Sequence, residues 1–497
     1  MSEDHKSLKQ IIDFRIEKLK KIKKDGINPF PSNFKPSHKS LFIKENYKDL
    51  EGSNVKIAGR IMAIRKMGKA SFSQIADSEG RIQFFIKKDD VGELGYDHFK
   101  LLDIGDHVGV LGKVFTTKTG EISIHTEKLT ILSKSIRPLP IVKEKDGEFF
   151  DAFKDKEQRY RNRHLDLIIN QNVKKTFIKR SKILKEIRLF LDEKDFLEVE
   201  TPILQPIYGG ANARPFRTHH NSLDQDLFLR IADELYLKRL IIGGIDKVYE
   251  MSKDFRNEGM DRNHNPEFTM LEFYWAYSDY EDCMSLVEEM IKKVSEKVGS
   301  SKIEWDNYKI DLSKPFNRVS FFDLLKTETG HDLKNIDLNK MRAICIENGI
   351  DADQNQNLGQ LLDQLMSKLV EPKLIEPTFV IDYPKSISPL AKIHRNGDEN
   401  IVERFELFIG GSEFANSFSE LNDPLDQRKR LEEQAKLKEL GDDEAHPIDE
   451  DFIQALECGM PPTGGVGVGI DRLTMLLTNN RWIKDVILFP ALRPESE

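Results

Sequence analysis

The chain of 497 residues has few cysteines and lacks a long apolar run. Cys283, Cys345 and Cys458 form no C-x-x-C pair and have no cluster of histidines near them. This spacing argues against a disulfide framework and a structural zinc site, and it favours a reducing compartment. No apolar stretch approaches the roughly 20 residues of a membrane span, and the lysine-rich N-terminus lacks the apolar segment of a secretory signal. We therefore expect a soluble cytoplasmic protein with no membrane partner.

An excess of basic charge is also missing. The 76 lysine and arginine residues are outnumbered by 84 aspartate and glutamate residues, which gives a formal net charge of -8. Any contact with RNA must therefore come from local patches. The length predicts roughly two to four domains, and an apolar content of 39% can fill their cores.

Two patterns occupy the first third of the chain. Residues 1–25 place apolar side chains at helical spacing among many lysines, and such a helix can pack on its own domain or contact a phosphate backbone. Five short alternating segments at 54–132 predict a small closed barrel of the OB type, a fold that often binds single-stranded nucleic acid. Phe72 could supply stacking there, but a barrel with ordinary core phenylalanines is an equal alternative.

The densest mixture of charge and aromatic side chains runs from Asp254 to Tyr274. Alternating segments at 245–255 and 268–276 flank a polar loop, which predicts a β-hairpin. One face of this hairpin would gather Arg256, Glu258, Phe268, Glu272 and Tyr274. A guanidinium for an anion, carboxylates for a cation and a ring for stacking favour a binding site over a salt-bridged surface hairpin.

Helices are expected at 173–193 and 280–298, and another is expected after a short strand, with Glu234 near its start, where an acid can simply cap the helix. Alternation between 403 and 420 predicts strands, with a possible shift of phase at a glycine pair.

Two stretches near the C-terminal end suggest phosphate chemistry. If Glu406 and Glu413 approach each other, they could hold a magnesium ion bound mainly through phosphates; the alternative is an exposed strand with solvated acids. Further on, a glycine-rich strand directly precedes a helix with Arg472 in its first turn, where an arginine can hold a terminal phosphate.

Three ordered motifs resemble those of class II aminoacyl-tRNA synthetases. They are F-L-E-V-E-T-P at 196–202, F-R-N-E at 255–258 with H-N-P-E-F-T at 264–269, and G-V-G-I-D-R at 467–472. Four further stretches are similar to the bacterial lysyl-tRNA synthetases: M-G-K-A-S-F at 67–72, G-G-A-N-A-R-P-F at 209–216, E-L-Y-L-K-R-L at 234–240 and F-S-E-L-N-D-P at 418–424. The resemblance covers essentially the whole chain, and the motifs are specific in combination.

The resemblance implies an α+β protein with an N-terminal OB-fold β-barrel and a class II catalytic domain, in which helices flank an antiparallel sheet. The expected parts are a basic helical extension at 1–45, an anticodon-binding OB-fold at 46–140, a hinge at 141–165 and the catalytic domain at 166–497. The implied activity is ATP-dependent formation of lysyl-adenylate and transfer of lysine to the 3′ end of tRNA(Lys). A homodimer and Mg²⁺ are implied as well.

The same resemblance implies a role for individual residues. Arg256 and Arg472 would be catalytic, the first on the α-phosphate of ATP and the lysine carboxylate, the second on the γ-phosphate. The implied ATP-binding residues are Arg256, Glu258, His264, Asn265, Phe268, Glu406, Glu413, Gly469 and Arg472. The implied lysine-binding residues are Gly210, Glu234, Arg256, Glu272, Tyr274, Asn416 and Glu420. Glu406 and Glu413 would bind magnesium. Phe72, Gln83 and Glu121 would contact the anticodon.

Three positions depart from the family pattern: Asp195 replaces a glycine, Asp233 a proline and Phe414 an aliphatic residue. They put local geometry in doubt, because none is a ligand-contacting position. Two other functions are kept as alternatives, a lysine ligase acting on a protein and a non-catalytic RNA-binding paralogue. The M-S-K at 251–253 resembles a class I synthetase motif, but no matching H-x-G-H accompanies it.

Overall fold

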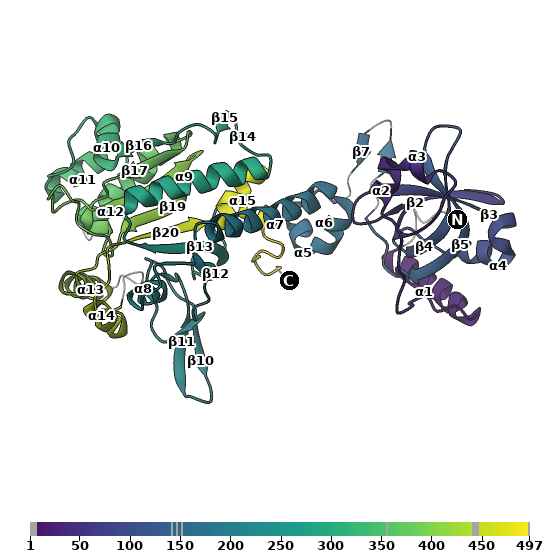
Figure 1. Ribbon diagram of the computed structural model, residues 1–497, viewed down its shortest axis with the longest axis horizontal. Coiled ribbons are helices and arrows are strands. Elements are labelled where there is room, and N and C mark those ends of the chain that lie inside the picture. Colours follow the sequence, from purple (N-terminus) through teal and green to yellow (C-terminus); the bar gives the residue numbers. More distant parts are fainter. Residues whose placement is uncertain are drawn as a thin grey trace. The chain divides into compact units, whose positions relative to one another are not determined.

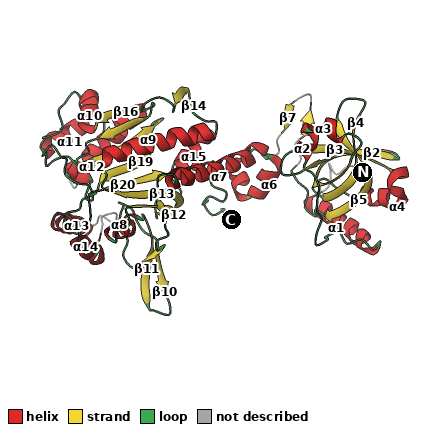
Figure 2. Cartoon of the chain, viewed as in Figure 1, coloured by secondary structure: helices red, strands yellow, loops and turns green. Residues whose placement is uncertain are grey.

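The computed structural model describes residues 7–140, 143–145, 148–150, 153–353, 356–439 and 447–495. The chain divides into two compact units, residues 1–154 and residues 155–497. Both contain helices and strands, as expected for an α+β protein (Figure 2). The division falls inside the 141–165 stretch that the sequence suggests as a hinge.

The first unit is built on a closed barrel with the strand order β1-β2-β3-β5-β4, which confirms the predicted five-stranded barrel. The barrel strands are β1 (Asn54–Met67), β2 (Ala70–Ala76), β3 (Arg81–Lys87), β4 (His107–Thr116) and β5 (Ile122–Ser133). The unit also contains the paired strands β6 (Lys143–Lys145) and β7 (Glu148–Phe150). Its helices are α1 (Leu8–Lys24), α2 (Ser40–Glu45), α3 (Tyr47–Leu50) and α4 (Lys88–Lys100). Alternate residues of β1, β2 and β3 are buried, as period-two strands around a barrel core require.

The basic N-terminal helix α1 docks on its own unit. Ile22 is buried in the barrel core, and the Arg15 guanidinium donates to the backbone oxygens of Ile104, Ser135 and Arg137 at 3.2 to 3.4 Å. The apolar stripe and one arginine therefore fix the helix, while most of its lysines stay exposed.

The second unit contains an eight-stranded sheet in the order β16-β17-β18-β19-β20-β13-β12-β8. The strands of the second unit, inside and outside this sheet, are β8 (Leu197–Glu198), β9 (Leu204–Gln205), β10 (Arg217–His220), β11 (Gln225–Leu229), β12 (Lys247–Phe255), β13 (Glu267–Ala276), β14 (Lys302–Trp305), β15 (Tyr308–Asp311), β16 (Asn317–Ser320), β17 (Thr378–Ile381), β18 (Arg404–Ile409), β19 (Ser412–Ser419) and β20 (Thr463–Gly469). Strands β9, β10, β11, β14 and β15 lie outside the eight-stranded sheet. The expected antiparallel arrangement holds for the six central strands. It needs correction at both edges, where β16 runs parallel to β17 and β8 runs parallel to β12.

The helices of the second unit include all those expected. They are α5 (Lys156–Arg161), α6 (Arg163–Ile169), α7 (Gln171–Asp192), α8 (Glu234–Ile242), α9 (Tyr280–Lys297), α10 (Phe321–Thr329), α11 (Leu338–Glu347), α12 (Leu358–Leu365), α13 (Pro424–Glu439), α14 (Glu450–Glu457), α15 (Ile470–Thr478) and α16 (Ile483–Val486), with the short turns η2 (Met366–Val370), η3 (Glu371–Lys373) and η4 (Lys385–Ile387). Asp195 follows α7 with a φ of 64°, a left-handed conformation that aspartate adopts more readily than most residues, so this departure from glycine is accommodated.

The central sheet has a helix-covered face and a polar face. Helices α7, α9 and α15 pack on the first face (Figure 1), against Leu271 and Phe273 of β13 and Val466 and Val468 of β20. Strand alternation turns the intervening residues to the other face. On β20 these residues are glycines, so the backbone itself lines the polar face.

The hairpin of β18 and β19 contains a two-residue turn and a bulge. Gly410 and Gly411 form the turn with φ values of 59° and 74°, which glycine adopts without steric cost. The register shift predicted at this glycine pair lies instead at Phe414, where Leu407 pairs with Ala415 and Phe408 pairs with Glu413. The extra residue brings Glu413 to the same face as Asn416, which strict alternation would prevent.

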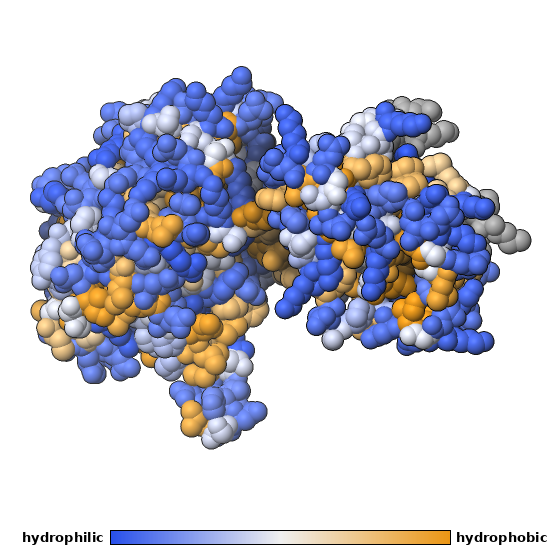
Figure 3. Space-filling view, turned by 45° about the vertical axis from the view of Figure 1, so that its right-hand side comes forward, coloured by the Kyte–Doolittle hydropathy of each residue, from blue (hydrophilic) through white to orange (hydrophobic). Residues whose placement is uncertain are grey.

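Among the described residues, we find no helix that is both long and apolar enough to cross a membrane. The molecular face in Figure 3 is mainly hydrophilic, with apolar groups interspersed.

Candidate active site

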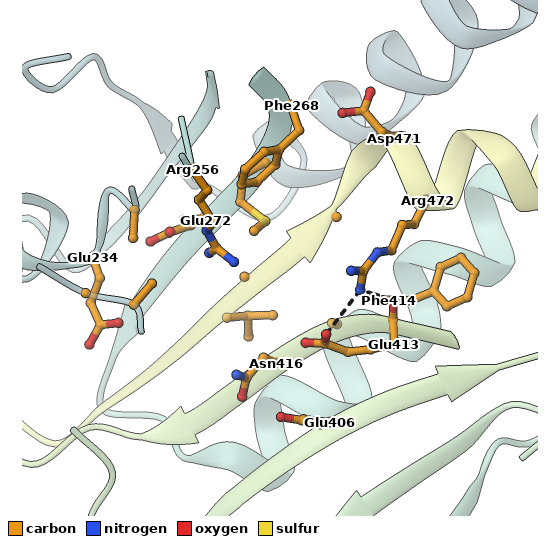
Figure 4. Close-up of a pocket in the computed structure, with 18 of the residues that line it drawn as sticks. Glu234, Arg256, Phe268, Glu272, Glu406, Glu413, Phe414, Asn416, Asp471 and Arg472 are labelled. Carbon is orange, nitrogen blue, oxygen red and sulfur yellow. Dashed lines mark hydrogen bonds and ion pairs between the residues drawn. The ribbon is translucent and has the colours of Figure 1, made fainter. Parts of the chain in front are cut away.

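A pocket of about 360 Å³ opens on the polar face of the central sheet. All the residues that the sequence suggests for ATP and lysine binding line it, although they come from separate parts of the chain. In Figure 4, Glu234 lies toward one end, and Arg472 with Glu413 lies toward the other. Glu272 on β13 and Arg256, directly after β12, project between these ends (Figure 4). The pocket is therefore elongated, with an acidic end and an arginine-containing end.

The predicted hairpin is formed by β12 and β13, with Asp254 opposite Phe268 and Glu250 opposite Glu272. The Arg256 guanidinium lies 5.1 Å from the centroid of the Phe268 ring, and its hydrogen bonds to the backbone oxygen of Ile231 are long, at 3.4 and 3.5 Å. The Arg256 guanidinium lies over the Phe268 ring and makes weak hydrogen bonds with the backbone, so it is available to bind an anionic ligand.

Arg472 projects from the first turn of α15 toward Glu413 and His264. Its Nη1 donates to the backbone oxygen of Glu413 at 2.9 Å and to the carboxylate at 3.1 Å. Its Nη2 lies 3.1 Å from His264 Nε2, and His264 Nδ1 contacts Asp261. The helix N-terminus and the guanidinium together offer an anion site at this end of the pocket.

Asp471 anchors the turn that presents Arg472. Its carboxylate accepts a hydrogen bond from the Thr269 backbone at 2.7 Å and pairs with Arg180 of α7 at 2.6 Å. This contact ties α15 to β13 and α7. Sequence reasoning did not single out Asp471 as a site residue, although it directly precedes Arg472.

Glu406 and Glu413 line the pocket together. Glu406 pairs with Arg404 at 2.6 Å and accepts from the Tyr383 hydroxyl at 2.8 Å. Burial, reinforced by the charge of Glu413 and opposed by Arg404, raises the pKa of Glu406 to about 7. A divalent cation would relieve this repulsion, and carboxylate oxygens are suitable donors for Mg²⁺, so the two acids fit a magnesium site.

Two expected ATP-binding residues have different settings. Glu258 is exposed at the pocket rim. Asn265 is buried, and its amide donates to the Glu267 oxygen at 2.6 Å while its side-chain oxygen accepts from the Ala491 backbone at 3.1 Å. Asn265 therefore also fastens the C-terminal segment to the pocket wall.

The acidic end of the pocket is almost closed to solvent. Glu234 and Glu420 are 5% and 1% exposed, and Glu272 accepts a hydrogen bond from the Tyr274 hydroxyl at 3.2 Å. A side chain at Gly465 would collide here, because its Cβ would lie 2.0 Å from Glu420 Oε1. Glycine at this position keeps a narrow slot open beside the acids.

Lys238 occupies the far side of this acidic end. Its fully buried Nζ pairs with both Glu234 and Glu420 and lies over the rings of Phe418 and Phe452. Sequence reasoning did not include Lys238 among the site residues. The available signal was the spacing of four between Glu234 and Lys238 on a helix. Glu234 does lie in the first turn of α8, as the capping alternative expects, but it makes no side-chain capping hydrogen bond there and pairs with Lys238 instead.

Residues 155–493 match the family described as tRNA synthetases class II (D, K and N), and residues 55–132 match the OB-fold nucleic acid binding domain. The chain belongs to the class II tRNA synthetases. It is 49% identical over 492 residues to a lysine--tRNA ligase of Porphyromonas gingivalis, covering 97% of this chain and 85% of that protein. It is 50% identical over 491 residues to a lysine--tRNA ligase of Pelotomaculum thermopropionicum, covering 98% and 96%.

The barrel of this synthetase has an aromatic outer face. Phe72 and Phe85 are register partners with ring centroids 4.9 Å apart, and Phe85 lies 5.3 Å from His125. Gln83 is on the same strand as Phe85 and donates to the Ser123 hydroxyl at 2.9 Å. Glu121 lies before β5 and contacts Lys44 at 3.5 Å. Half-buried rings of this kind suit stacking on unpaired bases.

Behind Glu272, the synthetase buries two more acids. Ligand oxygens of Asp233, Asp254 and Glu272 all lie within 4.8 Å of one another. Arg230 pairs with Asp233 at 3.0 Å, with Asp254 at 3.4 Å and with Glu250 at 2.7 Å. A single guanidinium is thus shared among several carboxylates. Burial of Asp233, together with the nearby charge of Asp254, raises the pKa of Asp233 to about 8.

We predict that Asp233→Asn stabilises the synthetase at alkaline pH. The pKa of Asp233 is about 8 in the folded protein against 3.8 ordinarily, so folding favours the protonated acid and stability falls as pH rises from 4 to 8. Asparagine does not ionise, so the variant should gain about 1 to 3 kcal/mol at pH 8 and much less at pH 5. Urea unfolding at several pH values measures this difference.

The matched control is Asp224→Asn, because the Asp224 side chain is 98% exposed. It should change the free energy of unfolding by less than about 0.5 kcal/mol at either pH. A gain for Asp233→Asn that is the same at pH 5 and pH 8 would contradict the assignment of a buried, protonated acid.

Proposed function

We propose that this synthetase activates L-lysine with ATP as lysyl-adenylate and transfers the lysyl group to the 3′ end of tRNA(Lys). The observation that supports lysine is the buried pair of Glu234 and Glu420 beside the slot at Gly465. Buried carboxylates require cationic partners, since an unpaired buried charge costs several kcal/mol. The relatives described above as lysine--tRNA ligases support the same substrate.

The proposed first step forms one bond and breaks another at the α-phosphorus. A carboxylate oxygen of lysine attacks this atom, the bond to the β-phosphate oxygen breaks, and pyrophosphate leaves with the electron pair. The carboxylate of lysine is already ionised at neutral pH. This step therefore needs correct positioning of the reactants and neutralisation of the phosphate charge more than it needs a general base. Arg256 suits contact with both the lysine carboxylate and the α-phosphate, since it projects into the middle of the pocket.

Other side chains would hold ATP in this arrangement. Phe268 offers a ring on which adenine can stack, and Arg472 suits the γ-phosphate at the opposite end from Glu234. Glu406 and Glu413 would hold Mg²⁺, which when bound neutralises phosphate charge. In the second step a terminal ribose hydroxyl of tRNA attacks the lysyl carbonyl carbon, and the bond from this carbon to the phosphate oxygen breaks. AMP leaves with the electron pair, and the hydroxyl proton passes to the leaving phosphate or to solvent.

The acidic end distinguishes lysine from aspartate and asparagine, the other amino acids in the family description. Glu234 and Glu420 would repel a carboxylate. The shorter neutral side chain of asparagine could not offer a cation to these acids, and a polar site left unsatisfied rejects a ligand strongly.

The deciding measurement is lysine-dependent exchange of labelled pyrophosphate into ATP, followed by transfer of lysine to tRNA(Lys). We expect exchange with lysine and at least about 100-fold less with aspartate or asparagine, because these cannot pair with the buried acids. Absence of exchange would exclude both the proposed function and a protein-directed lysine ligase. Exchange without transfer to tRNA would favour the protein-directed ligase.

A test of the proposed anticodon face is Phe72→Ala. Loss of one stacking ring should lower kcat/KM for tRNA(Lys) by about 10-fold, since stacking contributes about 1 to 3 kcal/mol per base. Pyrophosphate exchange should stay within about twofold, because it needs no tRNA. The control is Phe42→Ala on α2, an exposed phenylalanine outside the barrel strands. Equal losses of exchange and transfer would rule out an anticodon role for Phe72.

We also propose that the synthetase is a cytoplasmic homodimer. Apolar side chains are exposed on α7, in the first motif and directly after that motif: Ile178, Leu189, Leu197, Ile203 and Leu204. Such side chains favour burial against a second copy.

Sedimentation should therefore give twice the mass of the chain, and Ile178→Lys with Leu197→Lys should shift it toward the monomer. Leu94→Lys, on α4 of the first unit, is the control because Leu94 is 63% exposed. A monomer at micromolar concentration of the unaltered protein would exclude the dimer.

A further inference from the structure

The acids at the closed end of the pocket already hold a cation of the protein itself. Lys238 Nζ pairs with Glu234 from the same helix, α8, and with Glu420, which directly follows β19. Lys238 is fully buried, and its ammonium lies 5.5 Å from the centroid of the Phe418 ring and 5.8 Å from that of Phe452. When both carboxylates are ionised, the single ammonium balances only one of them. The cluster therefore needs one more positive charge to become neutral.

The second carboxylate oxygen of Glu420 lies on the side of the substrate pocket. Glu420 Oε2 contacts Lys238, whereas Oε1 is the atom that a side chain at Gly465 would meet. Glu234 and Glu420 both line the pocket, but Lys238 does not. The acids are therefore shared between a resident ammonium behind them and the pocket in front of them.

We propose that Lys238 is a positioning and specificity-determining residue that holds Glu234 and Glu420 in place and leaves them a single unmatched negative charge for the substrate ammonium. This inference rests on the proposed activation of lysine. A monocationic side chain completes the neutralisation of the cluster. A neutral side chain leaves one buried carboxylate without a cation, which is costly.

Burial raises the pKa of both Glu234 and Glu420, and Lys238 opposes the shift at each of them. Other charged or titratable groups around the cluster come from β13, β18 and α9. Arg404 of β18 opposes the rise in the pKa of Glu234 more weakly than Lys238 does. Tyr274 of β13 faces both acids and Glu272 of the same strand faces Glu234, and both have a raised pKa because they are buried. Cys283 of α9 faces Glu420, and burial raises its pKa as well. Among these groups, Lys238 is the cation that contacts both Glu234 and Glu420. Removing it leaves the two acids with a proton as the simplest replacement for its charge.

The test is Lys238→Met in the full-length protein, assayed by lysine-dependent pyrophosphate exchange between pH 6.5 and pH 9. At pH 7 the proton that replaces the charge of Lys238 occupies one carboxylate oxygen and does not hold the two acids in place, so KM for lysine should rise at least about 10-fold relative to the unaltered protein. The ratio of the two KM values should shrink as pH rises, because the proton is lost. KM for ATP should change less than about threefold.

The matched control is Lys292→Met. Lys292 pairs with Glu288 at the same spacing of four on α9, but it is partly exposed and lies outside the pocket lining. This control should leave KM for lysine within about twofold at each pH. It separates the loss of a helical ion pair from the loss of the ammonium in the pocket.

A charge-balanced variant keeps the test decisive if Lys238→Met folds poorly. Lys238→Met combined with Glu234→Gln removes one cation and one anion, so the cluster again has one unmatched negative charge. We expect the double variant to be more stable than the single variant and to have a KM ratio for lysine that varies little with pH. Additive losses in the double variant would overturn the proposal.

The remaining outcomes separate this inference from the proposed function. If the unaltered protein shows no lysine-dependent exchange, the proposed function fails. If it shows exchange but Lys238→Met has the same KM for lysine at pH 7, only the role of Lys238 is wrong. Equal rises in KM for lysine and ATP that do not vary with pH would indicate a general structural role and would also overturn it.

Discussion

The neutralisation of buried carboxylates is the constraint on which the pocket depends. Its acidic end encloses Glu234, Glu272 and Glu420, and Asp233 and Asp254 lie directly behind them. Each ionised carboxylate removed from water needs a cation, a proton or several hydrogen-bond donors. Lys238 and Arg230 supply part of this need, so a cationic ligand is favoured before any detail of its shape is considered.

The sheet makes this concentration of charge possible by separating it from the apolar core. Alternate residues of β13 face either the helices or the pocket, so Phe273 packs inside while Glu272 and Tyr274 face the ligand site. On β20 the pocket-facing residues are glycines, which bring the backbone close to the ligand space. The bulge at Phe414 then adds Glu413 to the polar face without breaking the core on the other side.

Local patterns predicted a large part of this arrangement, and long-range pairing decided the rest. The hairpin of β12 and β13 followed from period-two alternation around a polar loop, which needs no knowledge of distant residues. The site of the bulge did not follow, because register depends on the partner strand. Lys238 was missed for a similar reason. A glutamate and a lysine four residues apart usually form a surface pair, and its burial here depends on Glu420 from another part of the chain.

The two ends of the pocket have opposite electrostatic demands, and these demands order the substrates along it. The acidic end has more carboxylates than cations, whereas Arg472 at the other end is held by Glu413 and His264 in a way that a phosphate can replace. Lysine has an ammonium at the tip of its side chain and a carboxylate at its other end, so insertion tip first leaves the carboxylate directed toward Arg256. The reverse orientation would bring a carboxylate to Glu234 and Glu420. In the proposed reaction, charge would therefore set the direction in which lysine meets the α-phosphate.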